Sequence, residues 1–192
     1  MKSVQVLPEG YREIYAVNLQ KDKKAAVWIN VLALAIGLAM AVPMHFCVPI
    51  TCLFDMSQGS AAYFMRFGVM LGGMLLYLVL HEAVHGITMK YFGTKKIKYG
   101  FTGMYAFAGS DDYYDKRSYL TIALAPVVVF AVIFAVANCF VSEQWFWVVY
   151  LWQIANISGA AGDLFVTVKF SKMPGDILVQ DSGIGMTVYS RQ

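Results

Sequence analysis

The sequence predicts an all-α membrane protein with four transmembrane helices, and two observations support this fold class. Hydrophobic residues make up 59% of the 192 residues and charged residues 14%, a balance too apolar for a soluble domain of this size. Four apolar stretches each approach the roughly 20 residues with which a helix crosses about 30 Å of hydrocarbon. The predicted helices lie at about residues 25–50, 63–89, 119–141 and 145–168. We therefore expect one membrane-embedded domain over residues 1–192, with the lipid bilayer as its solvent.

The segments that flank the helices predict how the chain crosses the membrane. Residues 1–24 are polar and mixed and lack the basic-then-apolar start of a secretory signal peptide, so the first helix should stay in the membrane. Basic residues precede the first helix, fill the loop between the second and third, and follow the fourth, whereas Arg66 falls on the other side. The positive-inside rule then places both termini in the cytoplasm. Because the basic residues flank helices instead of forming a stripe, no nucleic-acid partner is expected.

The predicted second helix carries a pattern typical of a metal site. It ends in LVLHEAVHGITMKYFG, where His81 and His85 are four residues apart and share one helical face. That spacing lets two imidazoles bind one metal ion. Glu82 lies about 100° round the helix, where a carboxylate can reach a water on that metal without being a ligand. A catalytic zinc site takes three protein ligands and keeps one open position, so a third donor must come from elsewhere.

The loop that follows alternates in the manner of a β-strand. Aromatic and apolar residues take every second position across residues 97–108. We expect a short β-hairpin with a three-residue turn at 102–104, in which Phe101 faces Tyr105 and Tyr99 faces Phe107. Its free edge could pair with an extended substrate by strand addition. A loop that is merely anchored at the membrane interface by its aromatic residues fits the pattern equally well.

The predicted fourth helix supplies the candidate third ligand. In NISGAAGDL, Asp163 lies near the cytoplasmic end, and Asn156 lies seven residues earlier on the same face. Counted along the helices, Asp163 should lie at about the depth of the two histidines, in the inner leaflet. The small residues Gly159 and Gly162 would let this helix approach a neighbour closely, as a shared metal requires.

Other readings of these residues stay open. The rival third ligands are Asp111, Asp112 and Asp115 in the central loop, in a run that resembles a solvated turn before a helix, and His45 near the outer end of the first helix. A network of hydrogen bonds between helices, with an acid protonated and no metal, is the structural alternative. Ionisable residues inside a bilayer are expensive, which favours a functional role for the group.

Three short sequences carry a family resemblance: HEAVHG in the second predicted helix, ALAP in the third and NISGAAGD in the fourth. With them, roughly residues 69–170 resemble the zincin peptidase family DUF3267 and, more distantly, the site-2 proteases and the sporulation membrane protease. The chain departs from the site-2 pattern because Gly159 stands where proline is usual and Leu164 follows the aspartate in place of glycine.

The resemblance implies a role for each candidate residue. It implies Zn2+ on His81, His85 and Asp163, with Glu82 as the catalytic base. Asn156 would correspond to the asparagine that helps to hold the substrate carbonyl. The function to expect is therefore an intramembrane zinc metallopeptidase that cleaves a membrane protein or peptide substrate near the cytoplasmic face.

Two further function classes remain as alternatives. A non-catalytic metal-binding scaffold or adaptor would hold its helices together with the metal, but structure alone has no use for Glu82 as a base. A small transporter or proton relay would use the same ionisable groups, but the sequence lacks the repeated half common in transporters. The sequence predicts neither the substrate nor the oligomeric state.

Overall fold

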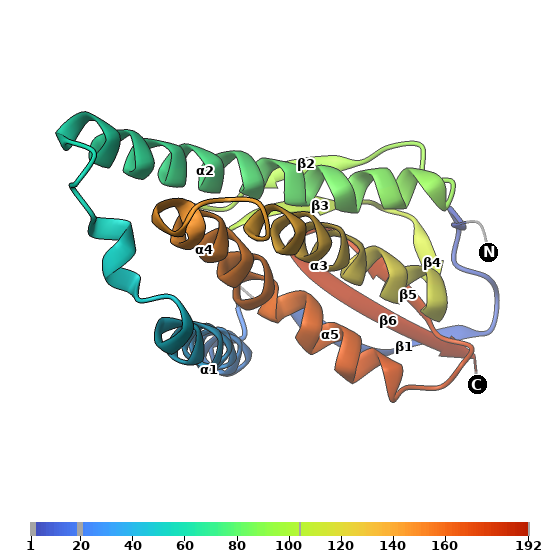
Figure 1. Cartoon of the computed structure of the whole chain (residues 1–192). Coiled ribbons are helices and arrows are strands. Elements are labelled where there is room, and N and C mark those ends of the chain that lie inside the picture. Colours follow the sequence, from blue (N-terminus) through green and yellow to red (C-terminus); the bar gives the residue numbers. More distant parts are fainter. Residues whose placement is uncertain (1–2, 19–20, 104, 192) are drawn as a thin grey trace. The chain divides into compact units, whose positions relative to one another are not determined.

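The chain is mostly helical (Figure 1) in a computed structural model that describes residues 3–18, 21–103 and 105–191. The helices are α1 (Lys23–Cys47), the 3-10 helix η1 (Ile50–Phe54), α2 (Ser60–Tyr91), α3 (Lys116–Asn138), α4 (Glu143–Gly159) and α5 (Ala161–Ser171). Within the described ranges, α1, α2 and α3 are the three helices long and apolar enough to cross a membrane. The first three predicted helices are therefore confirmed to within a few residues at each end.

The predicted fourth helix, residues 145–168, is wrong as one continuous span. The chain divides it into α4 and α5 at Ala160, whose backbone angles of φ −81° and ψ 18° leave the helical region. Gly159 stands directly before the break, and glycine costs a helix interior about 1 kcal/mol relative to alanine. Hydropathy could not reveal this break because Gly159, Ala160 and Ala161 form a small, uncharged run inside an apolar stretch.

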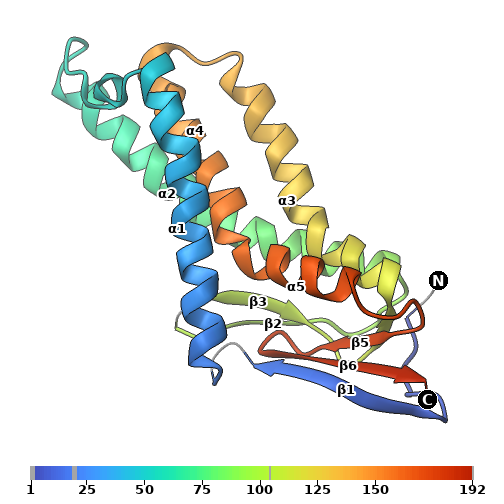
Figure 2. The ribbon, with the colours of Figure 1, turned by 90° about the horizontal axis from the view of Figure 1, so that it is seen from below.

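The all-α prediction also has to be corrected, because the described residues include two antiparallel sheets (Figure 2). Their strands are β1 (Tyr11–Asn18), β2 (Lys98–Phe101), β3 (Ala106–Gly109), β4 (Tyr113–Asp115), β5 (Leu178–Asp181) and β6 (Gly185–Arg191). One sheet has the order β1-β6-β5-β4, and the other pairs β2 with β3. An irregularity between Glu13 and Tyr15 interrupts the register of β1, so the sequence of this strand lacks a clean period of two.

The hairpin expected in the central loop is confirmed, but its predicted register is wrong by one residue. Phe101 pairs with Ala106, and Tyr99 pairs with Ala108. The Thr102 amide donates a hydrogen bond to the Tyr105 carbonyl, so Tyr105 belongs to the turn and not to the strand. The predicted turn at 102–104 includes residue 104, which lies outside the described residues. The aromatic side chains expected to face one another do not pair.

The chain forms two compact units. Unit 1 contains Met1–Ile29, Val79–Pro126 and Gly162–Gln192, and unit 2 contains Asn30–Leu78 and Val127–Ala161. Helices α1, α2 and α3 each contribute residues to both units. The expectation of one domain over residues 1–192 stays a prediction.

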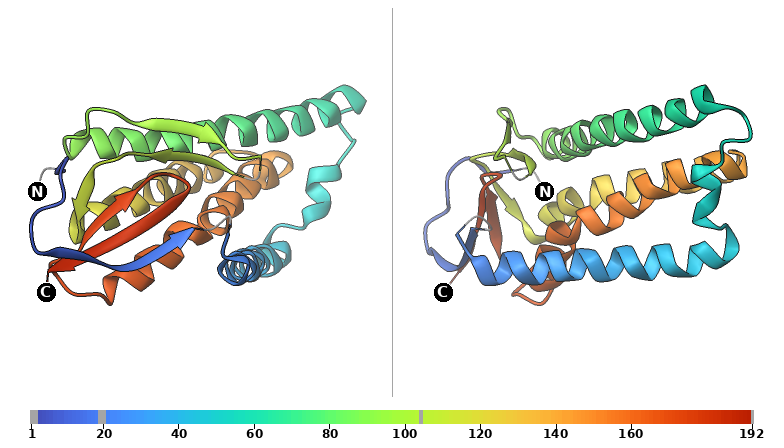
Figure 3. Two further views of the ribbon diagram at one scale, coloured as in Figure 1. Left: turned by 180° about the vertical axis from the view of Figure 1, so that it is seen from behind. Right: turned by 90° about the vertical axis from the view of Figure 1, so that its left-hand side faces the viewer.

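The core of unit 1 joins its helices to the four-stranded sheet. Met89 of α2, Ile122 of α3 and Phe170 of α5 are buried together with Val179 of β5 and Val188 of β6. Figure 2 shows α5 running alongside the sheet. The left view of Figure 3, from the opposite side to Figure 1, shows β4, β5 and β6 next to α5. The end of α2, the start of α3 and the second half of α5 are therefore held by one apolar core.

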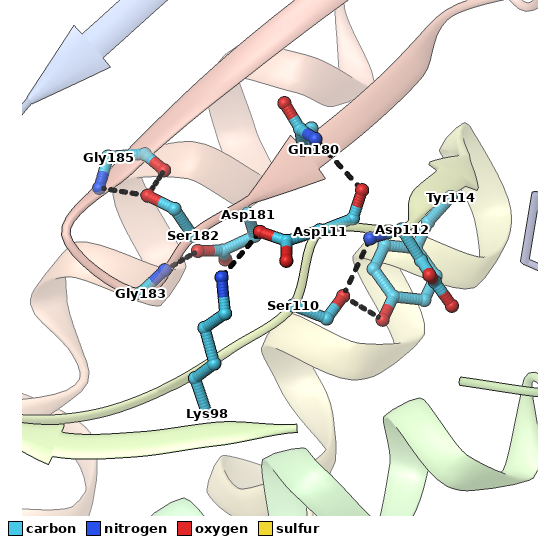
Figure 4. A network of polar contacts seen from close by, with 10 residues as sticks. All are labelled: Lys98, Ser110, Asp111, Asp112, Tyr114, Gln180, Asp181, Ser182, Gly183 and Gly185. Carbon is cyan, nitrogen blue, oxygen red and sulfur yellow. Dashed lines mark hydrogen bonds and ion pairs between the residues drawn. The ribbon is translucent and has the colours of Figure 1, made fainter. Parts of the chain in front are cut away.

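The hairpin of β2 and β3 is fastened to the turn between β5 and β6. The Ser110 amide donates to the Asp181 carbonyl at 2.7 Å. Lys98 and Asp111 form an exposed ion pair at 2.6 Å, drawn in Figure 4. Gly109 is needed here, because a Cβ atom at this position would lie 2.3 Å from the backbone carbon of Ser182. The position of β3 within unit 1 is thereby fixed.

Unit 2 has a separate core, built around tryptophans of α4. Trp147 is fully buried with Val148 and Leu53. The indole of Trp152 donates to the Met70 carbonyl of α2 at 2.9 Å. These contacts pack α4 against η1 and the first part of α2.

Candidate metal centre

The end of α2 brings its two histidines together as the sequence spacing predicts. His81 and His85 lie one helical turn apart, with ring centroids 4.9 Å apart and an edge-to-face orientation. Each is 8% exposed, so both imidazoles are removed from bulk water. Buried polar groups need partners, and these two side chains point to a third group in unit 1.

That third group is Asp163 in the first turn of α5. Its Oδ2 atom lies 3.5 Å from Nε2 of His81 and 3.7 Å from Nε2 of His85. The break at Ala160 matters here, because it places the carboxylate at a helix N-terminus, where the unpaired amides favour negative charge. The predicted ligand set is therefore assembled, although by a new helix start instead of a long fourth helix.

The donor atoms fit a zinc ion. Over the part of the chain that the structure describes, these three residues form the group of metal-binding side chains whose ligand atoms all lie within 4.8 Å of one another. Zinc bonds to histidine nitrogen and carboxylate oxygen are about 2.0–2.2 Å long, so neighbouring donors in a tetrahedral site are separated by about 3.4 Å. Two imidazoles and one carboxylate also leave the open position of a catalytic site.

The ring of His85 is oriented by a hydrogen bond on its side away from the other ligands. Nδ1 of His85 lies 2.9 Å from the carbonyl oxygen of Ile122 in α3. Since a carbonyl only accepts hydrogen bonds, Nδ1 carries the proton and Nε2 presents its lone pair to the other donors. Sequence reasoning missed this partner because it is a backbone atom.

Glu82 lies beside the ligands and contacts the hairpin. It is half-buried, and the Ala108 amide of β3 forms a hydrogen bond with its carboxylate. On the same stretch of α2, Tyr99 packs over Gly86, where a Cβ atom would lie 1.9 Å from the Tyr99 hydroxyl. The hairpin therefore runs next to the helix that carries the proposed base.

The remaining candidates lie elsewhere. Asn156 belongs to unit 2, where its side chain donates to the Val127 carbonyl at 2.9 Å and accepts from the Tyr77 hydroxyl at 3.2 Å. Its role toward a substrate stays a prediction.

The rival ligands have other partners: Asp111 pairs with Lys98, Asp112 accepts from Ser3, Asp115 accepts from the Ser118 amide at the start of α3, and His45 accepts from the Ile50 amide.

Asp181, at the end of β5, is a buried acid that the sequence analysis did not single out. Its carboxylate accepts a hydrogen bond from the Tyr119 hydroxyl at 2.9 Å. It accepts another from the Gly183 amide at 2.8 Å, which Figure 4 draws. Burial raises the pKa of Asp181 above its ordinary value, against the lowering effect of these hydrogen bonds. A lone aspartate before a turn has no spacing pattern that could have identified it.

Comparison with known proteins agrees with this geometry. A family model described as "Putative zincin peptidase" and named DUF3267 matches residues 74–178, more than half of the chain. The chain belongs to the DUF3267 family. The matched region contains the end of α2, with His81 and His85, as well as Asp163 in α5.

The chain is similar to an uncharacterized 24.7 kDa protein in the gap 5' region of Pyrococcus woesei. The two are 31% identical over 115 residues, which cover 57% of this chain and 50% of the relative. The match thus spans about half the length of that protein. No solved structure matches the chain.

Proposed function

We propose that this DUF3267 protein is an intramembrane zinc metallopeptidase that hydrolyses a peptide bond of a membrane-associated protein near the cytoplasmic face. The observation that carries the proposal is the convergence of His81, His85 and Asp163 with Glu82 beside them. Family membership supports metallopeptidase chemistry. The hydropathy and length of α2, which carries three of the four residues, support a location in the membrane.

The chemistry that we propose divides between the metal and Glu82. Zinc on these ligands supplies a Lewis acid, which makes a water more nucleophilic at neutral pH and polarises the scissile carbonyl. Glu82 accepts the proton that the water loses as its oxygen bonds to the carbonyl carbon. The same carboxyl then gives this proton to the departing amine as the C–N bond breaks, which leaves a carboxylate and an amine as products.

We further propose that β3 holds the substrate. The Ala108 amide that bonds to Glu82 points away from β2, and Ala106, two residues earlier, presents its backbone along the same edge. A helical substrate must become extended before its peptide bond is accessible, and its backbone then needs new hydrogen bonds. Strand addition along β3 would supply these bonds next to the catalytic base.

The decisive experiment compares Glu82→Gln with Glu143→Gln in the full chain purified in detergent. The readouts are zinc content and the initial rate of cleavage of a mixed library of quenched fluorescent peptides. Loss of the general base should lower the rate by about 10²–10⁴-fold, while equimolar zinc is retained. Glu143 is exposed at the start of α4, so its variant should match the wild type in both readouts.

The alternatives predict different results. A metal-binding scaffold would retain zinc in every variant and would cleave no peptide. Removal of the zinc by a chelator would lower its thermal stability. A transporter would couple zinc binding to ion flux in vesicles. Equal cleavage by wild type and Glu82→Gln, or the absence of zinc from the wild type after zinc is supplied, would refute the peptidase proposal.

A further inference from the structure

The Ile122 carbonyl that contacts His85 lies in the interior of a helix, where carbonyl groups ordinarily have partners. In an α-helix the carbonyl of residue i accepts a hydrogen bond from the amide of residue i+4. For Ile122 that residue is Pro126, which lies inside α3 and has no amide hydrogen. The proline ring also crowds the carbonyl four residues before it and turns it outward. The sequence ALAP thus leaves one carbonyl of α3 free for a side chain.

Because the Ile122 carbonyl is buried, it needs a hydrogen-bond donor from the protein. Ile122 is 1% exposed, so water is not freely available to its backbone. A buried carbonyl without a partner is costly, and the Nδ1–H group of His85 at 2.9 Å meets the requirement. The contact serves both groups, because it also selects the histidine tautomer whose Nε2 lone pair faces Asp163 and His81.

We propose that Pro126 is a positioning residue of the metal centre. By removing the helical donor, it reserves the Ile122 carbonyl for His85 and fixes this ligand in the tautomer that binds a metal through Nε2. The inference builds on the metal site of the proposed function, but it requires no peptidase activity. All the residues involved belong to unit 1.

The alternative is that Pro126 affects only the shape or stability of α3. Pro126→Ala separates the two roles, because alanine is a far better helix former than proline and should not weaken the helix itself. The new amide at residue 126 would compete with His85 for the Ile122 carbonyl. A carbonyl has two lone pairs, so this competition should weaken the contact with His85 without abolishing it.

The control is another helix proline. Pro43 lies inside α1, which carries none of the three ligands, and its replacement by alanine restores an amide in the same way. Pro43→Ala therefore reproduces the gain in helix propensity without touching the metal centre.

The test uses the full chain in detergent, with histidine labelled with ¹⁵N, and has two readouts. Zinc affinity is measured by competition with a chelator. The His85 tautomer is read from its ring ¹⁵N shifts before zinc is added, at a pH high enough for the ring to be neutral. Pro126→Ala should weaken zinc binding by about 10-fold or more, as expected when a partner of a ligand is lost, and should mix the two tautomers. Pro43→Ala should leave both readouts at wild-type values.

The proposal is overturned if Pro126→Ala keeps the wild-type affinity and tautomer, or if Pro43→Ala weakens zinc binding equally. Should Pro126→Ala fail to fold, the wild type still decides, since the proposal requires the Nδ1–H form of His85 in the metal-free protein. Failure of the proposed function is separable, because a protein that binds zinc but cleaves no peptide would leave this inference intact.

Discussion

Each unit buries a cluster of polar groups, and the two clusters differ in how they are completed. In unit 2 the Arg66 guanidinium is 1% exposed and donates to backbone carbonyls of Cys52, Leu53 and Gln144 at 3.0, 3.4 and 3.4 Å, and also to that of Asp55. The N–H groups of the guanidinium thus find backbone carbonyls as acceptors, so the chain itself supplies the hydrogen-bond partners of this cluster. In unit 1, by contrast, His81, His85 and Asp163 turn ligand atoms toward one another.

The difference distinguishes a structural polar cluster from a binding site. A buried arginine surrounded by carbonyls fixes a loop, and any further ligand would have to displace one of its hydrogen bonds. Nitrogen and oxygen ligand atoms that converge on one point can all bind one cation placed among them. Unit 2 should therefore respond to mutation through stability, and unit 1 through metal binding.

The largest effect should follow from Asp163→Asn. Loss of a charged ligand should weaken zinc binding by more than about 100-fold, since losing a mere partner of a ligand already costs 10- to 100-fold. Isothermal titration with zinc measures this change. Asp111→Asn is the matched control, because Asp111 is 74% exposed and forms a surface ion pair of little energetic weight. Equal zinc affinities for the two variants would contradict the assignment of Asp163 as a ligand.

A change in stability is expected from Arg66→Met. The substitution leaves several buried carbonyls without their donor, which should cost about 3 kcal/mol in the free energy of unfolding. A lower midpoint in thermal unfolding would reveal it, and the folded fraction should still bind equimolar zinc. Arg66→Lys keeps a charge but can satisfy fewer carbonyls, so an intermediate loss is expected. Loss of zinc binding at a temperature where Arg66→Met remains folded would erase the distinction between the clusters.

The parts of the fold that sequence could predict are those with local signals. Long apolar runs predict three of the helices. The alternation of apolar and other side chains predicts the β2–β3 hairpin. The four-stranded sheet carries no such signal, because β1 and β6 come from opposite ends of the chain and β1 is irregular between Glu13 and Tyr15. The break at Ala160 was missed because small residues such as Gly159 and Gly162 predict close helix packing as well as the end of a helix.

The site shows the same division. His81 and His85 follow from spacing within one helix, which sequence records directly. Asp163 was inferred from the depths of residues along separate helices and from the family resemblance, and the helix start that presents it was not foreseen. The Ala108 amide and the Ile122 carbonyl could not be predicted from side-chain patterns, because every residue has a backbone carbonyl and almost every residue a backbone amide. Only the tertiary structure determines which of these groups contact Glu82 and His85.

The smallest effect on stability should come from Gly86→Ala, with Gly68→Ala as its control on the same helix. No neighbouring atom lies within 4 Å of a Cβ at Gly68, so that variant should simply gain up to about 1 kcal/mol of helix propensity. At Gly86 the same gain is offset, because the new methyl group must displace the Tyr99 hydroxyl, the far end of a side chain that is 55% exposed and free to move. Zinc affinity and kcat should stay unchanged, while KM for cleaved peptides should rise several-fold if the hairpin holds the substrate. A fall in kcat with KM unchanged would instead mean that the hairpin acts through Glu82, and the proposed pairing of substrate with β3 would have to be abandoned.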